Sequence, residues 1–264
     1  MERGSIRLAE RRRLRRRLSL VVFAILIVLV IGAIIYGIRQ NALRISHVEV
    51  FGADASFSTY ATNAMQGSYF GIIPRDSILF FPEKRIRADI LVSHNDIAAV
   101  SIFRNGFTGI SIKVDYRVPI ARWCGLGPTE GVEEYCYVID ANGTVFAAAA
   151  MTTRPINPFS LYAPLVGNTL EPMLATISNA GKLPEAFDFA RQLATLGSPV
   201  EKVVIKDGEV NDFLASGTRV TYVLGREQDA FTALVSARDN FNLSDSSVDY
   251  IDLRFDGKVY LKKK

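Results

Sequence analysis

Residues 18–38 contain no charged side chain and consist mainly of Leu, Ile and Val. A helix of about 20 residues is ~30 Å long, which matches the hydrocarbon thickness of a bilayer. A cleaved signal peptide is the alternative, but it has a shorter apolar core followed by a small-x-small cleavage motif. The residues at 36–39, Tyr-Gly-Ile-Arg, make a poor cleavage site. We therefore expect an uncleaved transmembrane helix over residues 19–39.

The charges that flank this segment predict its orientation. Residues 1–18 carry eight arginines and two glutamates, a net charge of +6, whereas only Arg39 and Arg44 follow soon after the span. The positive-inside rule therefore places residues 1–18 in the cytoplasm as a short basic tail and exports the chain from about residue 40. No later segment is long and apolar enough to cross again.

The arginine run is an alternative candidate for nucleic-acid binding, but its position directly beside the apolar span favours a topological role. The whole chain carries +4, so the residues after 18 share a charge of −2. The exported part is therefore close to neutral, and we expect it to bind no nucleic acid.

The exported chain divides into two predicted domains, residues 44–117 and 118–264. In the first, alternation around Val48 and Val50 predicts a strand, and Ser58 is the expected cap of a helix that runs to residue 66. A second helix places Ile86 and Ile90 on one face, and two strands follow at 97–104 and 108–117. The order is strand, helix, helix, strand, strand.

Residues 118–264 contain more strands than helices. Residues 152–172 include four prolines and are predicted to form an irregular connector in which Leu165 and Val166 pack. Helices are expected at 184–196 and 227–240. Alternating apolar residues and Asn-Gly or Asp-Gly turns predict strands at 121–126, 135–139, 144–149, 200–206, 210–214, 218–224, 248–254 and 258–262.

Cys124 and Cys136 enclose eleven residues that include three glycines and a proline. In an exported domain, disulfides persist, so we expect the pair to form a bond that clamps this loop between two strands. Closing such a loop contributes about 3 kcal/mol by the chain-entropy estimate. Two free, inert thiols are the alternative.

Catalytic motifs are scarce in this sequence. Its two histidines, His47 and His94, have no metal-binding spacing, and we expect both to be ordinary surface or edge-strand residues. A Ser-His-Asp triad assembles in space, so sequence leaves it open, but no G-x-S-x-G motif or phosphate-binding glycine loop supports one. Asp140-x-Asn142-Gly143 lacks the remaining ligands of a calcium loop and is expected to be a turn.

Five motifs in order behind the anchor resemble the FtsQ/DivIB family of bacterial cell-division proteins. The residues that carry the resemblance are Ile45-x-x-Val48-x-Val50-x-Gly52; Val100-Ser101-Ile102-Phe103-Arg104 with Ile110-Ser111-Ile112-Lys113-Val114; Pro119-Ile120-Ala121-Arg122-Trp123; Val138-Ile139-Asp140-x-x-Gly143-x-Val145-Phe146; and Tyr250-Ile251-Asp252-Leu253-Arg254-Phe255-x-Gly257-x-Val259-Tyr260. The cysteine pair, the proline-rich connector and the short tail depart from most members.

The resemblance implies an α+β fold: one transmembrane helix, a small βααββ POTRA (polypeptide-transport-associated) domain and a mixed-sheet β domain with helices on one face. It also implies a non-catalytic, single-pass scaffold of the bacterial cell (inner) membrane, located at the division septum, that links divisome assembly to septal peptidoglycan synthesis. FtsB- and FtsL-like coiled-coil proteins are the implied partners, and the POTRA domain is implied to recruit other divisome components. No cofactor or small-molecule substrate is implied.

The last predicted strand is the most informative candidate site. It is expected to lie at a sheet edge, where its lysines either block aggregation or flank a site of strand addition. In the family, the region after the D-L-R-aromatic motif receives the FtsB-like partner. That implicates Arg254 and Phe255, and less directly Lys258 and Tyr260, with Arg254 expected to pair with a partner carboxylate.

Two other functions remain as alternatives. A membrane-anchored envelope enzyme requires a pocket with converging titratable groups. A POTRA-containing secretion or envelope-assembly factor places such domains before a transmembrane β-barrel, and residues 118–264 leave no room for one.

Overall fold

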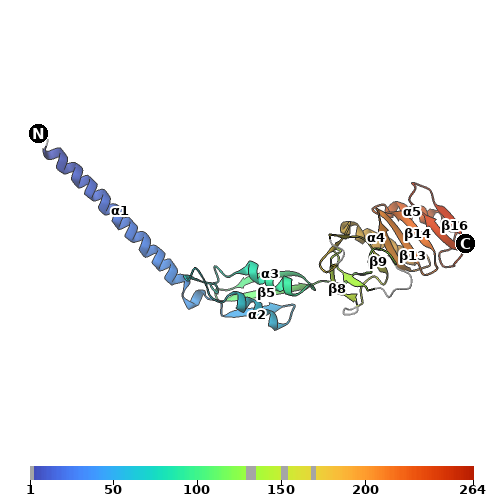
Figure 1. Ribbon diagram of the computed structural model, residues 1–264, viewed down its shortest axis with the longest axis horizontal. Coiled ribbons are helices and arrows are strands. Elements are labelled where there is room, and N and C mark those ends of the chain that lie inside the picture. Colours follow the sequence, from blue (N-terminus) through green and yellow to red (C-terminus); the bar gives the residue numbers. More distant parts are fainter. Residues whose placement is uncertain (1–2, 129–134, 150–153, 168–170) are drawn as a thin grey trace. The chain divides into compact units, whose positions relative to one another are not determined.

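The computed structural model describes residues 3–128, 135–149, 154–167 and 171–264, with side chains described from residue 16 onward. The chain forms two compact units, Met1–Asp115 and Tyr116–Lys264. Their boundary lies two residues before the one expected at residue 117 (Figure 1).

The first unit begins with one long helix, α1 (Arg3–Ile38). Its segment Arg16–Ile38 has 23 residues and is long and apolar enough to cross a membrane. At 1.5 Å per residue this segment is about 34 Å long. The segment predicted as the anchor is thus helical, and the helix also continues upstream through most of the expected basic tail.

The rest of the first unit is a small α+β fold. Its sheet has the strand order β1-β5-β4, with β1 (His47–Phe51) parallel to β5 (Gly109–Tyr116) and β4 (Ile97–Asn105) beside β5. Helices α2 (Ser58–Ala64) and α3 (Glu83–Ser93) lie between β1 and β4 in the chain. The predicted order of elements is confirmed, with one additional hairpin, β2 (Ser68–Tyr69) and β3 (Ile73–Pro74).

Periodic apolar residues form the core of this unit, and the predicted Ile86 and Ile90 are fully buried in it. The prediction that Ser58 caps α2 is wrong, because Ser58 is the first residue of the helix. The N-cap of α2 is Phe57, which makes no side-chain capping bond. Asp54 caps the preceding 3₁₀ turn, Ala55–Phe57, where its carboxylate accepts a 2.7 Å hydrogen bond from the backbone N–H of Ser56. The helix also ends at Ala64, two residues early.

The second unit contains a nine-stranded mixed sheet with the order β16-β15-β14-β13-β12-β9-β6-β7-β8. The strands are β6 (Ala121–Trp123), β7 (Tyr137–Ile139), β8 (Val145–Ala148), β9 (Ser160–Tyr162), β12 (Val200–Lys206), β13 (Glu209–Leu214), β14 (Arg219–Val223), β15 (Val248–Asp252) and β16 (Tyr260–Lys263). A separate pair is formed by β10 (Leu165–Val166) and β11 (Thr176–Ile177).

The connector predicted over residues 152–172 is wrong at its centre. Its three residues Ser160–Tyr162 form β9, which lies between β6 and β12 and is parallel to both. Leu161 and Tyr162 are fully buried. A strand this short, flanked by prolines, shows too little alternation to be recognised. Of the two residues expected to pack, Leu165 is buried and Val166 is exposed.

Two helices, α4 (Leu183–Thr195) and α5 (Glu227–Ser236), pack on the same face of this sheet. Phe189 of α4 packs its ring 4.3 Å from that of Tyr222 on β14, and Phe231 of α5 packs edge-on against Phe189. The helix predicted to run to residue 240 ends at Ser236 and is followed by a 3₁₀ turn, Arg238–Asn240. Figure 1 shows both helices beside β13 and β14.

Candidate functional site

Strand β16 forms one edge of the nine-stranded sheet, as predicted. It pairs antiparallel with β15, and three of its four residues are exposed, with Leu261 half-buried. An edge strand presents main-chain N–H and C=O groups that another chain can pair with. The candidate site therefore consists of the main-chain groups of this edge and the side chains that lie beside it.

The register identifies which main-chain groups face outward. The N–H of Leu253 donates to the carbonyl of Thr221 at 2.8 Å, so residues 251 and 253 face β14 and the residues between them face β16. Tyr250 and Asp252 pair with residues 262 and 260 of β16. Because successive residues of a strand face opposite sides, the main chain of Leu261 and Lys263 faces away from the sheet.

Phe255 and Tyr260 form an exposed aromatic pair beside this edge. Their ring centroids are 5.2 Å apart with the rings nearly perpendicular. The side chains are 51% and 48% exposed. Two neighbouring, half-exposed aromatic rings offer rigid apolar area to a partner at a low entropic cost.

Arg254 connects this aromatic pair to the sheet. Its guanidinium donates to both carboxylate oxygens of Asp252, at 2.9 and 2.6 Å, and to Glu209 at 2.8 Å. It also lies 5.9 Å from the centroid of the Phe255 ring. The hydrogen bonds to Asp252 and Glu209 raise the pKa of Arg254, and the hydrogen bond from Arg254 lowers the pKa of Asp252.

These contacts differ from the role expected for Arg254. The sequence suggested a pair with a partner carboxylate, whereas the structure places three of its N–H groups on carboxylates of its own chain. Arg254 is therefore a positioning residue, because it fixes the segment from which Phe255 projects.

Lys258 lies in the loop that joins β15 to β16. Its backbone N–H donates to the carbonyl of Phe255 at 3.1 Å, and Gly257 supplies the left-handed conformation that the turn requires. The predicted hairpin is confirmed, because β15 and β16 pair antiparallel, but its loop covers residues 253–259 and is longer than expected. Strand β15 ends at Asp252, where the Arg254 side chain turns back onto the Asp252 carboxylate. The side chain of Lys258 is exposed.

A groove of about 740 Å³ separates this loop from α5. Arg226 lies in it and forms ion pairs with Asp256 of the loop and Asp229 of α5, the second at 3.4 Å. The α5 residues that line it recur at helical spacing on one side: Asp229, Thr232, Ala233 and Ser236, with Ala237 directly after the helix. The sequence analysis did not predict this side of the groove, although the small residues at helical spacing could have indicated it.

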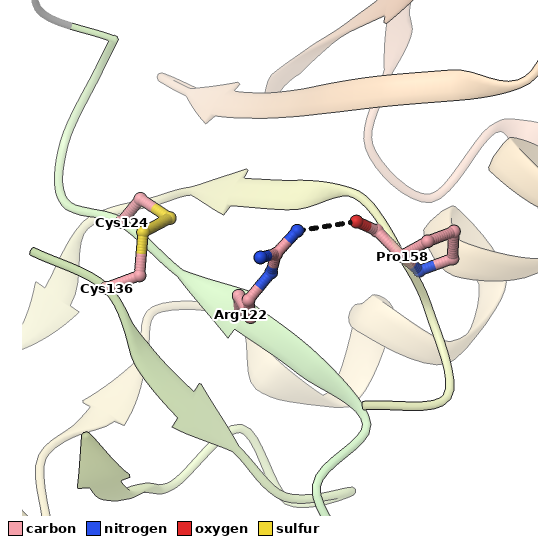
Figure 2. Close-up of a disulfide and its surroundings, with 4 residues drawn as sticks. All are labelled: Arg122, Cys124, Cys136 and Pro158. Atoms are coloured by element: carbon pink, nitrogen blue, oxygen red, sulfur yellow. Dashed lines mark hydrogen bonds between the residues drawn. A yellow bond between two sulfur atoms is a disulfide. The ribbon is translucent and has the colours of Figure 1, made fainter. Parts of the chain in front are cut away.

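Cys124 and Cys136 form a disulfide (Figure 2). The bond lies beside the paired strands β6 and β7, and Arg122 of β6 donates to the carbonyl of Pro158 at 2.9 Å, as Figure 2 shows. Residues 129–134 of the enclosed loop lie outside the described part of the chain. In the sheet, five strands separate β6 from β16, so the bond is remote from the edge.

The histidines and the Asp140 segment, which the sequence analysis considered as possible sites, make contacts with residues of their own surroundings. His47 is exposed on β1, and His94 packs on Phe57 and lies 3.1 Å from the hydroxyl of Tyr60. The carboxylate of Asp140 accepts hydrogen bonds from the N–H groups of residues 142 and 144, both at 2.9 Å, so this segment is a turn as predicted. Within the described ranges, no group of three or more His, Cys, Asp or Glu side chains is arranged to hold a metal ion.

A buried acid under the helices was not predicted. Asp212 of β13 is fully buried and faces Tyr222, and Glu227 lies nearby. Burial raises the pKa of Asp212 well above its ordinary value, and burial also raises the pKa of Tyr222. The alternation of β13 gave no sign of this acid, because Asp212 occupies a position typical of an apolar residue.

Comparison with models of known protein families gives no match to this chain. Comparison with curated proteins also gives none.

Proposed function

We propose that this chain is a non-catalytic, single-pass membrane scaffold of the FtsQ/DivIB type. In this proposal α1 anchors it in the bacterial cell (inner) membrane with the basic end in the cytoplasm. The part of the first unit that follows α1 corresponds to the POTRA domain, and the second unit corresponds to the β domain. The exported part binds FtsB- and FtsL-like coiled-coil proteins at the division septum and thereby connects divisome assembly to septal peptidoglycan synthesis.

The observation that carries this proposal is the open main chain of β16. Leu261 and Lys263 turn their N–H and C=O groups away from the sheet, so an incoming strand finds partners without any rearrangement. The aromatic pair of Phe255 and Tyr260 lies beside this edge, where a partner strand would place its side chains. Backbone pairing supplies affinity and the aromatic rings supply specificity.

The charged groups of the site favour binding over catalysis. Arg254 is engaged by Asp252 and Glu209, and Arg226 by Asp229 and Asp256. Charged side chains that hold one another in place suit a fixed binding surface. Lysines near the end of β16 add positive charge that an acidic partner segment would complement.

Affinity purification of the tagged, detergent-solubilised chain tests the proposal. We expect small single-pass coiled-coil proteins and other division components to co-purify. Replacing Phe255 by Glu should abolish this co-purification while the circular dichroism spectrum stays unchanged. Ile156→Glu is the matched control, because Ile156 is also an exposed apolar residue of the second unit. Recovery of secretion machinery alone, or an unchanged pull-down by the Phe255 variant, would contradict the proposal.

A further inference from the structure

The hairpin of β2 and β3 presents exposed apolar side chains at its tip. Phe70 is 97% exposed and Ile72 is 46% exposed. Phe70 also adopts a left-handed backbone conformation, with φ at 50°, which is rare for a bulky residue. A strained turn that holds an aromatic ring in solvent suggests that the ring has a binding partner.

This tip is attached to the end of the apolar helix. Arg39 directly follows α1, and its guanidinium donates to the carbonyls of Ile72 and Gly71, both at 3.1 Å. The hairpin is thus held at the point where α1 ends.

The segment after the hairpin reinforces this attachment. The N–H of Ile78 donates to the carbonyl of Leu43 at 2.9 Å, and the N–H of Ile45 donates to the carbonyl of Asp76 at 2.7 Å. The carboxylate of Asp76 also pairs with Arg44 at 2.5 Å. With these bonds on the residues between α1 and β1, the hairpin cannot swing freely away from the end of the helix.

We propose that the β2–β3 hairpin inserts Phe70 and Ile72 into the interfacial region of the lipid bilayer beside α1. This inference rests on the proposed membrane anchoring by α1. Aromatic residues favour the level of the lipid headgroups, and exposed apolar area is removed from water there. Arg39 and Arg75, which stacks 5.2 Å from the ring centroid of Tyr69, lie where lipid phosphates would accept hydrogen bonds.

A second contact with the membrane would restrict the orientation of the first unit. One helix alone lets an exported domain rotate about the helix axis, whereas a helix and an inserted hairpin fix two points. The first unit would then have a defined orientation relative to the bilayer surface.

The test uses the full chain reconstituted into phosphatidylcholine vesicles, with and without bromine on the lipid acyl chains near the headgroup. Phe70→Trp places a fluorophore at the tip, and the emission of the parent chain, which comes from the buried Trp123, is subtracted. Val92→Trp is the control because Val92 is 80% exposed near the end of α3.

Val92 lies at the far end of the first unit from the anchor. The strand β4 starts soon after α3, where the N–H of Ile97 donates to the carbonyl of His94. It ends at Asn105, close to Thr108, whose carbonyl accepts from the N–H of Ser46. The nine residues of β4 therefore separate the end of the first unit near Val92 from the end near Ser46 by about 26 Å.

We expect brominated lipid to quench the tryptophan at position 70 and to leave the tryptophan at position 92 unaffected. Flotation of the vesicles measures anchoring separately. Failure of the chain to float would overturn both the anchoring and this inference. A floating chain with no quenching at position 70, or with equal quenching at both positions, would overturn the inference alone.

Discussion

The guanidinium of Arg254 forms two hydrogen bonds with the carboxylate of Asp252, two residues earlier in the chain, at 2.9 and 2.6 Å. This local fork ends β15 and turns the chain so that Phe255 projects into solvent beside Tyr260. The position of the exposed aromatic pair therefore depends on an ion pair within the chain.

Arg254→Lys should weaken partner binding without unfolding the chain, because an ammonium group cannot form the bidentate fork or contact Glu209 at the same time. The pair is partly exposed, so its loss should lower the free energy of unfolding by about 1 kcal/mol or less. Titration calorimetry with the co-purified partner and urea unfolding measure the two effects. Arg85→Lys is the control, because it makes the same exchange at an exposed arginine of the first unit. Equal affinity of the Arg254 variant and the parent would contradict the positioning role.

Asp212→Asn should stabilise the second unit at neutral pH. Because the pKa of Asp212 is raised in the folded state, the unfolded chain releases this proton first, from about pH 4 upward. The folded state then holds more protons than the unfolded state, so its stability falls as pH rises towards the folded pKa. The variant should lack this loss, and urea unfolding at several pH values measures the difference. The exposed Asp239→Asn should show no such gain.

Reduction of the disulfide should destabilise the second unit by about 3 kcal/mol, because it releases the loop between Cys124 and Cys136 in the unfolded chain. The double variant Cys124→Ser, Cys136→Ser should show a similar loss and should retain partner binding, since the bond is remote from β16. Alkylation of the denatured, unreduced protein provides the direct check. A mass increase of two alkyl groups would show that the bond is absent.

Asp140→Ala should cost about 3 kcal/mol, because it leaves the largely buried Arg117 without its carboxylate and leaves two turn N–H groups without an acceptor. Asp140→Asn keeps an oxygen for the turn and removes only the charge, so it should cost less. Thermal unfolding of the two variants separates these contributions. Equal losses would mean that the turn hydrogen bonds contribute little.

Sequence patterns predicted the elements whose signals are local. The apolar segment gave α1, and alternation together with Gly turns gave β12, β13 and β14 to within about a residue at each end. Strand β9 was not predicted. It is buried because it pairs with β6 and β12, which are distant in sequence, and its three residues show no periodic pattern of their own.

The candidate site was predicted in part. The alternation of apolar residues predicted the strand that forms the edge, and the family resemblance pointed to Phe255. The partners of Arg254 and the wall that α5 provides were not predicted. Glu209 reaches Arg254 only because β13 and β15 both flank β14, and α5 reaches the loop only because it packs over the same sheet.

Substitution of Leu261 by proline tests the central claim most directly, since proline removes the one outward-facing N–H at the middle of β16 while Tyr260 and Lys262 keep their bonds to β15. Leu261→Ala is the matched control, because it loses the same half-buried side chain and keeps the N–H. We predict that the partner binds the alanine variant and fails to bind the proline variant, with both variants folded by circular dichroism. Equal affinity of the two variants for the partner would contradict docking by strand addition at this edge.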